Sequence, residues 1–187
     1  PTDDDMFDWM QAAADAADIA QVLYTTYWTG YSTTLEMFER LTKIDQVVAI
    51  KWSAPDAFLF EQGLRHFAKH FLIVDNQCDF VKSHMYGGRS VNLHACNYAP
   101  KWGQKFWELL ESHQYFDAQH EVARVVSPYY DLFFEMYKET SGEGTLDKLC
   151  LEQIGLEGGP VRPPQRDIRE KYRPKVREML VKNGVIS

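Results

Sequence analysis

One lysine in this chain stands where carbonyl chemistry could be done. Lys51 follows the run Val47-Val48-Ala49-Ile50, whose apolar and mostly β-branched side chains predict a short buried strand. A lysine that is desolvated at the end of such a strand has its ammonium form disfavoured, which frees the amine to attack a carbonyl carbon. The alternative is a surface lysine just past an edge strand, and this stretch taken alone favours that alternative.

Polar side chains also end two other predicted strands. Tyr24 ends a predicted strand over residues 19–24, and Asp75 and Asn76 follow a predicted strand over residues 71–74. A tyrosine near a lysine supplies a proton donor and acceptor for carbonyl chemistry. Tyr24 could instead be a packed aromatic with its hydroxyl at the rim, and Asp75 could cap the helix after its strand.

A fourth predicted strand, over residues 90–95, alternates apolar and polar side chains. If its apolar residues face the helices, Asn92 and His94 point into the interior of a barrel. Polar groups there are costly without a ligand, a water molecule or a partner. We therefore expect both residues near a site, although a hydrogen-bonded core histidine is the more ordinary role for His94.

The elements that would position these side chains alternate between strand and helix up to about residue 95. This order predicts βαβ units and a parallel sheet, whose C-terminal strand ends meet at one edge. From Pro100 onward the pattern predicts helices only, with a break at Ser141-Gly142. The predicted helices cover residues 3–17, 34–43, 55–70, 78–86, 101–112, 116–140, 144–154 and 167–182.

Composition limits the classes of function. The chain has 187 residues, with 45% hydrophobic and 25% charged residues, as expected for one globular domain of ordinary size. The net charge of -7 argues against a nucleic-acid surface, and no apolar run reaches the length of a membrane span. The three cysteines lack metal-ligand spacing, so we expect a reduced, cytoplasmic setting and no metal site.

Four parallel strands cannot close into a barrel by themselves, and their sheet edges would stay open. Either these residues are part of a longer chain, or they pair with another subunit. We favour the longer chain, because the sequence starts at Pro1 without a methionine.

Several short motifs, taken together and in order, resemble one known family, that of dihydrodipicolinate synthase and N-acetylneuraminate lyase. The motifs are Val22-Leu23-Tyr24, Thr29-Gly30, the run Val47 to Lys51, Gly87-Gly88 with Asn97 and Pro100, and the tail segments 144–149 (GTLDKL) and 158–164 (GGPVRPP). The resemblance covers essentially the whole chain, but only the later part of the family's sequence. The family's hydroxyl-rich glycine motif, which grips the substrate carboxylate, has no counterpart here.

The resemblance implies an α/β fold, the (β/α)8 TIM barrel. Residues 1–112 would supply strands five to eight, the second half of the barrel, and residues 113–187 a C-terminal extension of three helices. Half a barrel lacks the carboxylate grip, so we expect the isolated 187 residues to be inactive. Family members are often tetramers, which makes a homo-oligomer, a tetramer or a dimer, the expectation.

The resemblance also implies roles for individual residues. Lys51 looks like the lysine that forms a Schiff base with pyruvate or another 2-oxo acid, and Tyr24 like the tyrosine that shuttles protons. Ser53, Asn76 and His94 lie where lyase members contact the distal part of the substrate. Asn92 would lie beside the lysine. The small-molecule partners would be a 2-oxo acid and an aldehyde, with no separate cofactor.

One departure from the family bears on the substrate. True dihydrodipicolinate synthases carry an arginine just before Thr-Gly to bind a carboxylate of the aldehyde, and this chain has Trp28 there. Loss of a bidentate cation should weaken the binding of a dicarboxylate-type substrate, so we expect a different lyase or aldolase. With Tyr27 and Trp52, Trp28 would make an aromatic mouth for a sugar-derived or apolar 2-oxo acid, unless these rings only pack. Dehydration of a 2-oxo-3-deoxy sugar acid, or a non-catalytic binding or structural role, remain alternatives.

Overall fold

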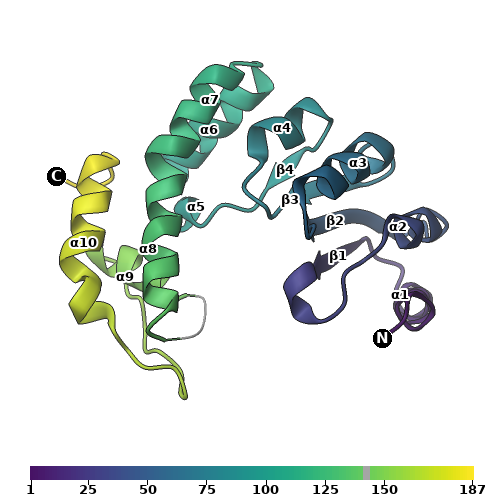
Figure 1. Cartoon of the computed structure of the whole chain (residues 1–187), viewed down its shortest axis with the longest axis horizontal. Helices are drawn as coiled ribbons and strands as arrows, with labels where there is room; N and C mark the ends of the chain where they lie inside the picture. The colour runs from purple at the N-terminus through teal and green to yellow at the C-terminus, as the bar shows by residue number, and fades with distance from the viewer. Residues whose placement is uncertain (141–143) are drawn as a thin grey trace. The chain divides into compact units, whose positions relative to one another are not determined.

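The computed structural model describes residues 1–140 and 144–187, and the break predicted at Ser141-Gly142 falls outside them. The chain divides into two compact units, Pro1–Asn92 and Leu93–Ser187, which are described separately (Figure 1). The predicted division at residues 112 and 113 into a half barrel and an extension stays a prediction.

A parallel sheet forms the centre of the first unit. Its strands run in the order β1 (Gln21–Thr26), β2 (Val47–Ser53), β3 (Leu72–Asp75) and β4 (Ser90–Val91). All three pairings are parallel, as the alternation of strand and helix predicted. Within the described residues β1 and β4 each pair on one side only, so this sheet has two edges.

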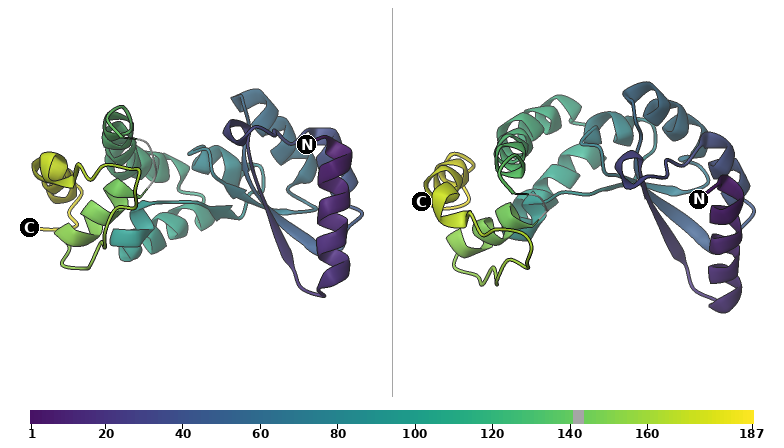
Figure 2. Two further views of the ribbon diagram at one scale, coloured as in Figure 1. Left: turned by 90° about the horizontal axis from the view of Figure 1, so that it is seen from below. Right: turned by 60° about the horizontal axis from the view of Figure 1, so that its bottom comes forward.

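Helices α1 (Asp3–Ala16), α2 (Leu35–Leu41) and α3 (Ala57–Phe67) cover one face of the sheet (Figures 1 and 2). Trp52 of β2 lies in this interface and is 1% exposed, with its ring centre 4.9 Å from that of Phe38. The expectation that Trp52 lines an aromatic mouth is therefore wrong. Its position in the strand points it at the helices, because neighbouring side chains on a strand alternate between faces.

Three predicted helix starts are satisfied by local hydrogen bonds. Thr2 Oγ1 accepts from the amide of Asp5, and the Asp5 carboxylate accepts from the amide of Thr2, which makes a capping box. Thr34 caps α2 by accepting from the amide of Met37, and Asp56 caps α3 by accepting from that of Leu59. These caps supply acceptors to amides that have no partner within the helix.

The fourth strand is shorter than predicted. It ends at Val91, whereas alternation predicted a strand over 90–95. The amides of Cys96 and Asn97 bond to the carbonyls of Leu93 and His94, which closes a turn instead of continuing the ladder. A short helix follows, α5 (Ala95–Tyr98), with His94 at its N-terminal boundary in the right-handed helical region.

The second unit is helical, as predicted. The helix predicted over residues 116–140 contains a π-helical segment, η2 (Val122–Val126). Pro128 explains this segment, because proline has no amide proton and its ring clashes with the carbonyl four residues earlier. Besides η2 and α5, the unit contains α6 (Pro100–Glu111), α7 (Tyr115–Glu121), α8 (Ser127–Tyr137), α9 (Thr145–Gln153) and α10 (Arg169–Lys182). None of the described helices is long and apolar enough to cross a membrane.

Candidate active site

Lys51 and Tyr24 lie side by side on neighbouring strands. Their Cα atoms are partners in the register of β1 and β2, so both side chains leave the sheet on the face opposite the helices. The Lys51 Nζ atom lies 4.3 Å from the centre of the Tyr24 ring. The strand order and the burial pattern therefore bring together the two residues predicted for carbonyl chemistry.

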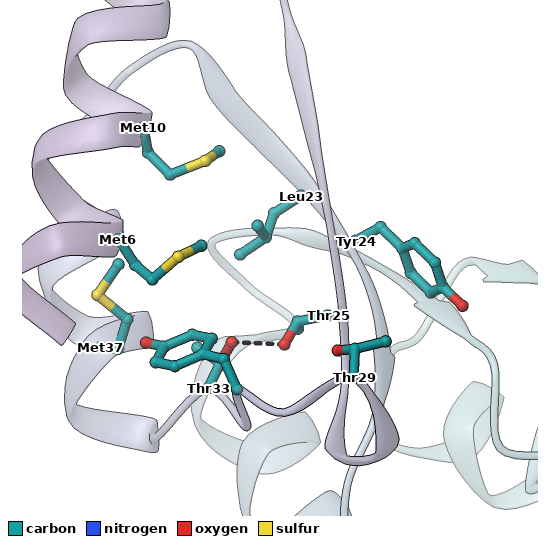
Figure 3. Close-up of a pocket in the computed structure, with 9 residues that line it drawn as sticks. Met6, Met10, Leu23, Tyr24, Thr25, Thr29, Thr33 and Met37 are labelled. Atoms are coloured by element: carbon teal, nitrogen blue, oxygen red, sulfur yellow. Dashed lines mark hydrogen bonds between the residues drawn. The ribbon is translucent and has the colours of Figure 1, made fainter. Parts of the chain in front are cut away.

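The surroundings of Lys51 and Tyr24 leave both side chains partly accessible. The Lys51 side chain is half-buried, and Tyr24 is 53% exposed. Figure 3 shows Tyr24 on the opposite side of β1 from Leu23 and Met10, which face the helical layer. A ring beneath an ammonium attracts it through the π-electron face, which holds the lysine above the tyrosine.

Ser53 and Asn76 are joined directly at the ends of β2 and β3. Ser53 Oγ donates to the carbonyl of Asn76 at 2.8 Å, and Asn76 Nδ2 donates to Ser53 Oγ at 2.8 Å. Ser53 lies two residues after Lys51 on the same strand, so it shares the face of the lysine. Gln77, which sequence reasoning missed, ties the same two loops together by accepting from the amide of Ala54 at 2.8 Å.

Asp75 does not join this group. It is fully buried and is the register partner of Trp52, on the helix-facing side of the sheet. Its Oδ1 accepts from the amide of Gln77 at 2.7 Å, so it holds the turn after β3. Burial raises the pKa of the Asp75 carboxyl to about 7, and the nearby Asp79 charge adds to the rise.

Two other residues predicted for the site, Asn92 and Trp28, also lie in the first unit. Asn92 is half-buried, and its amide donates to the carbonyl of Asp75 at 2.8 Å. Trp28 belongs to a short 3-10 helix after β1, η1 (Tyr27–Thr29), and is 52% exposed. Its ring meets that of Tyr27 edge to face at 4.9 Å. Substrate contacts by Asn92 and Trp28 stay predictions.

The prediction that a strand carries His94 is wrong, because β4 ends at Val91. His94 belongs to the second unit. Its Nδ1 is 2.8 Å from Oδ2 of Asp147, and its ring stacks on Tyr129 at 5.0 Å. The Tyr129 hydroxyl donates to the other Asp147 oxygen at 2.7 Å. Burial, and then the Asp147 carboxylate, raises the pKa of Tyr129. This arrangement is the hydrogen-bonded core histidine that the sequence left open, and a substrate contact stays a prediction.

Asp147 was missed as the partner of His94. The only sequence signal was its place in the quoted tail segment 144–149, which suggests no partner. Its contact with His94 joins residues 53 apart in the chain. Periodicity describes local structure, so it carries no information on such a pair.

A small cavity of about 120 Å³ lies behind β1, on its helix-facing side (Figure 3). Met6, Met10 and Met37 line it together with hydroxyl-bearing side chains, of which Thr25 and Thr33 bond to each other at 2.5 Å. Tyr24 also contributes to the lining of this cavity, whereas Lys51 does not. Among the described residues, no group of three or more His, Cys, Asp or Glu side chains could hold a metal ion.

The model of the dihydrodipicolinate synthetase family matches residues 1–183. The chain belongs to this family. A relative in the family, 4-hydroxy-tetrahydrodipicolinate synthase of Archaeoglobus fulgidus, is 24% identical over 190 residues. That match covers 100% of this chain and 63% of the relative, so the chain spans under two thirds of such a relative's length.

Solved structures of the dihydrodipicolinate synthetase family share the fold. The dihydrodipicolinate synthase of Cyanidioschyzon merolae, solved with lysine bound, matches with a TM-score of 0.83 and 20% identity, over 100% of this chain and 62% of that one. N-acetylneuraminate lyase of Fusobacterium nucleatum matches with a TM-score of 0.77 and 18% identity, over 97% and 61% of the two chains. These neighbours are TIM-barrel enzymes, and the parallel α/β sheet of this chain has the same arrangement.

Proposed function

We propose that the protein is a lyase or aldolase that forms a Schiff base between Lys51 and pyruvate or a related 2-oxo acid. The observation that carries the proposal is the position of the Lys51 amine, 4.3 Å from the centre of the Tyr24 ring on the neighbouring strand. Membership of a family that includes synthases and lyases supports the same chemistry. A nucleophilic amine beside a phenol has the two groups that carbinolamine formation needs.

The reaction would proceed as follows. The Lys51 ammonium loses a proton to solvent and the free amine adds to the keto carbon. The Tyr24 phenol passes a proton to the carbonyl oxygen, which becomes a hydroxyl. Tyr24 then takes a proton from the nitrogen and passes it to that hydroxyl, which leaves as water. The product is a protonated imine, which draws electrons from the neighbouring carbon. The bond between the third and fourth substrate carbons then breaks, and its electron pair forms an enamine. The aldehyde departs as its hydroxyl proton returns to Tyr24, and protonation and hydrolysis of the enamine free the lysine.

The polar groups around the lysine suggest how the rest of the substrate is held. Ser53 and Asn76 form one hydrogen-bonded pair on the side of β2 and β3. In the proposal they contact the distal part of the substrate, together with Asn92. Trp28 stands where the resemblance places an arginine, and this supports a substrate without a second carboxylate.

The proposal assigns strands five to eight of a TIM barrel to this chain. The open edges at β1 and β4 and the 63% coverage of the relative support that assignment. In the proposal, the other half of the barrel carries the carboxylate grip, and the complete protein is a cytoplasmic homo-oligomer.

Exchange of the methyl protons of pyruvate in D2O tests the proposal without knowledge of the aldehyde. An enamine forms and reverts only if the imine forms, so the full-length protein should replace these protons with deuterium, as followed by proton NMR. The Lys51→Ala variant should lose all exchange above the background rate. Exchange that persists in Lys51→Ala, or none in the full-length protein, would contradict the proposal.

A further inference from the structure

A second site candidate lies wholly within the second unit. A groove of about 1040 Å³ runs between α6, α7 and the segment Asn183–Val185 that follows α10. The residues that line it include Trp102 and Phe106, whose rings stack with centres 5.3 Å apart and planes 15° apart. Two stacked aromatic rings of this kind can pack against a flat apolar group, and the groove is large enough for a small organic molecule.

Two buried polar atoms among the groove's residues have no hydrogen-bond partner within the described chain. They are the hydroxyl of Tyr98 and Nδ2 of Asn183, on side chains that are 3% and 8% exposed. A buried donor that is left unpaired is costly, so such groups are uncommon without a ligand or water. Burial also raises the pKa of Tyr98, so its hydroxyl keeps its proton. Both groups can therefore donate to an oxygen acceptor, and because each atom is itself closed to solvent, an acceptor reaches it only when a neighbouring side chain shifts.

Charged side chains that line the groove influence which ligand charge it favours. Lys101 and Lys105 lie four residues apart on α6, so they project from the same side of the helix. Glu108 and Asp117 also line the groove, and the wall is therefore not uniformly positive. Two donors, two ammonium groups and interspersed carboxylates fit a single carboxylate better than a more highly charged phosphate.

The π-helical segment η2 contributes to the same place. Arg124 of η2 lines the groove and donates through Nη1 to the carbonyl of Asn183 at 2.9 Å. Its Nε also donates to Glu121 at 3.0 Å, and Trp102 Nε1 donates to Glu121 at 2.6 Å. These hydrogen bonds hold Asn183 in place, and the side-chain Nδ2 of Asn183 is the atom without a partner. π-Helical segments are frequent at functional sites because they re-aim side chains within a helix.

We infer that this groove binds a small monocarboxylate with a flat apolar body. The carboxylate accepts from the Tyr98 hydroxyl and the Asn183 amide, and the apolar body packs on Trp102. Lys101 and Lys105 supply the compensating positive charge. The inference rests only on residues of the second unit and does not depend on the Schiff-base proposal.

Benzoate is a suitable probe, with benzamide as its uncharged counterpart, and binding to the full-length protein is measured by calorimetry. Benzoate should bind saturably, and benzamide at least tenfold more weakly. Tyr98→Phe removes only the hydroxyl and should weaken benzoate about tenfold, the equivalent of about 1.4 kcal/mol. Tyr137→Phe, at an exposed tyrosine of α8, is the matched control and should bind as the unmodified protein does.

The same variant has a second readout in the absence of benzoate. Removal of an unpaired buried hydroxyl should leave the melting temperature of Tyr98→Phe unchanged or higher. A lower melting temperature would show that the hydroxyl is already paired, and would overturn the inference. No saturable benzoate binding, or equal binding by Tyr98→Phe, would also overturn it. Lys51→Ala should bind benzoate normally, and loss of binding in that variant would assign the probe to the Schiff-base site instead.

Discussion

The buried carboxyl of Asp75 makes the stability of the fold depend on pH in a direction that the structure fixes. Burial raises its pKa from 3.8 to about 7 in the folded protein. Between these two values the unfolded chain has released this proton and the folded chain still holds it. The free energy of unfolding therefore falls as pH rises through this interval, because the folded state binds more protons. Below about pH 4 and above about pH 7 the Asp75 contribution is constant.

The size of the effect follows from the same interval. One pKa unit corresponds to about 1.4 kcal/mol, so an interval of about three units gives up to about 4 kcal/mol. Asp75→Asn keeps the shape of the protonated carboxyl and the oxygen that accepts from the Gln77 amide. We therefore expect this variant to be more stable than the unmodified protein at pH 8, by as much as about 4 kcal/mol. The two proteins should have nearly equal stability at pH 4.

Urea unfolding followed by circular dichroism at pH 4, 6 and 8 gives the required difference in free energy. Asp45→Asn is the matched control, because it removes one carboxylate from an exposed position of the same unit. Its difference from the unmodified protein should be small at each pH. The reasoning fails if the advantage of Asp75→Asn does not grow with pH. It also fails if this variant is the less stable protein at pH 8, since the Asp75 carboxylate would then be paired in the fold.

Three further substitutions test the packing and the site. Gly63→Ala would place a methyl group 2.2 Å from Trp52 Cζ3, and should lower the free energy of unfolding by about 2 kcal/mol in urea titrations. Asp147→Ala removes the acceptor of the Tyr129 hydroxyl, and should lower the melting temperature through a loss of about 3 kcal/mol. Tyr24→Phe should slow methyl-proton exchange about a hundredfold or more, because it removes the proposed proton donor. Its melting temperature should not change, since Tyr24 is half exposed.

Each of these substitutions has a control at an exposed position of the same unit. Arg65→Ala changes an exposed position of α3, and Asp131→Ala an exposed carboxylate of α8, so both should be nearly neutral. Tyr27→Phe removes the hydroxyl of an exposed tyrosine near Tyr24 and should leave exchange intact. A neutral Gly63→Ala would mean that the Trp52 ring can move aside. Unchanged exchange in Tyr24→Phe would remove that residue from the proton relay.

Local patterns predicted much of the first unit correctly. The run ending at Lys51 predicted a buried strand, and the structure places β2 there in a parallel sheet. Helices were predicted over residues 3–17 and 34–43, and Thr2 and Thr34 accept the amide hydrogen bonds that cap the observed helices there. These features depend on residues within one or two turns, so the order of side chains is sufficient to predict them. The pairing of Tyr24 with Lys51 followed because parallel strands align their ends.

Features that depend on distant parts of the chain were not predictable in this way. The alternation over residues 90–95 fits a strand, but His94 is held by Asp147, 53 residues later. Trp52 is a different case, because strand alternation alone places it on the face opposite Lys51, and the space beside Gly63 accommodates its ring among the helices. The roles of Lys51, Tyr24 and the substrate-contacting residues remain predictions.

Borohydride reduction in the presence of pyruvate tests the central claim most directly. The full-length protein is treated with both reagents and digested, and the peptides are analysed by mass spectrometry, with a Lys51→Arg variant as the control. The account predicts a reduced pyruvate adduct on Lys51 and no adduct on the variant. The absence of any adduct, or an adduct confined to another lysine such as Lys82, would contradict it.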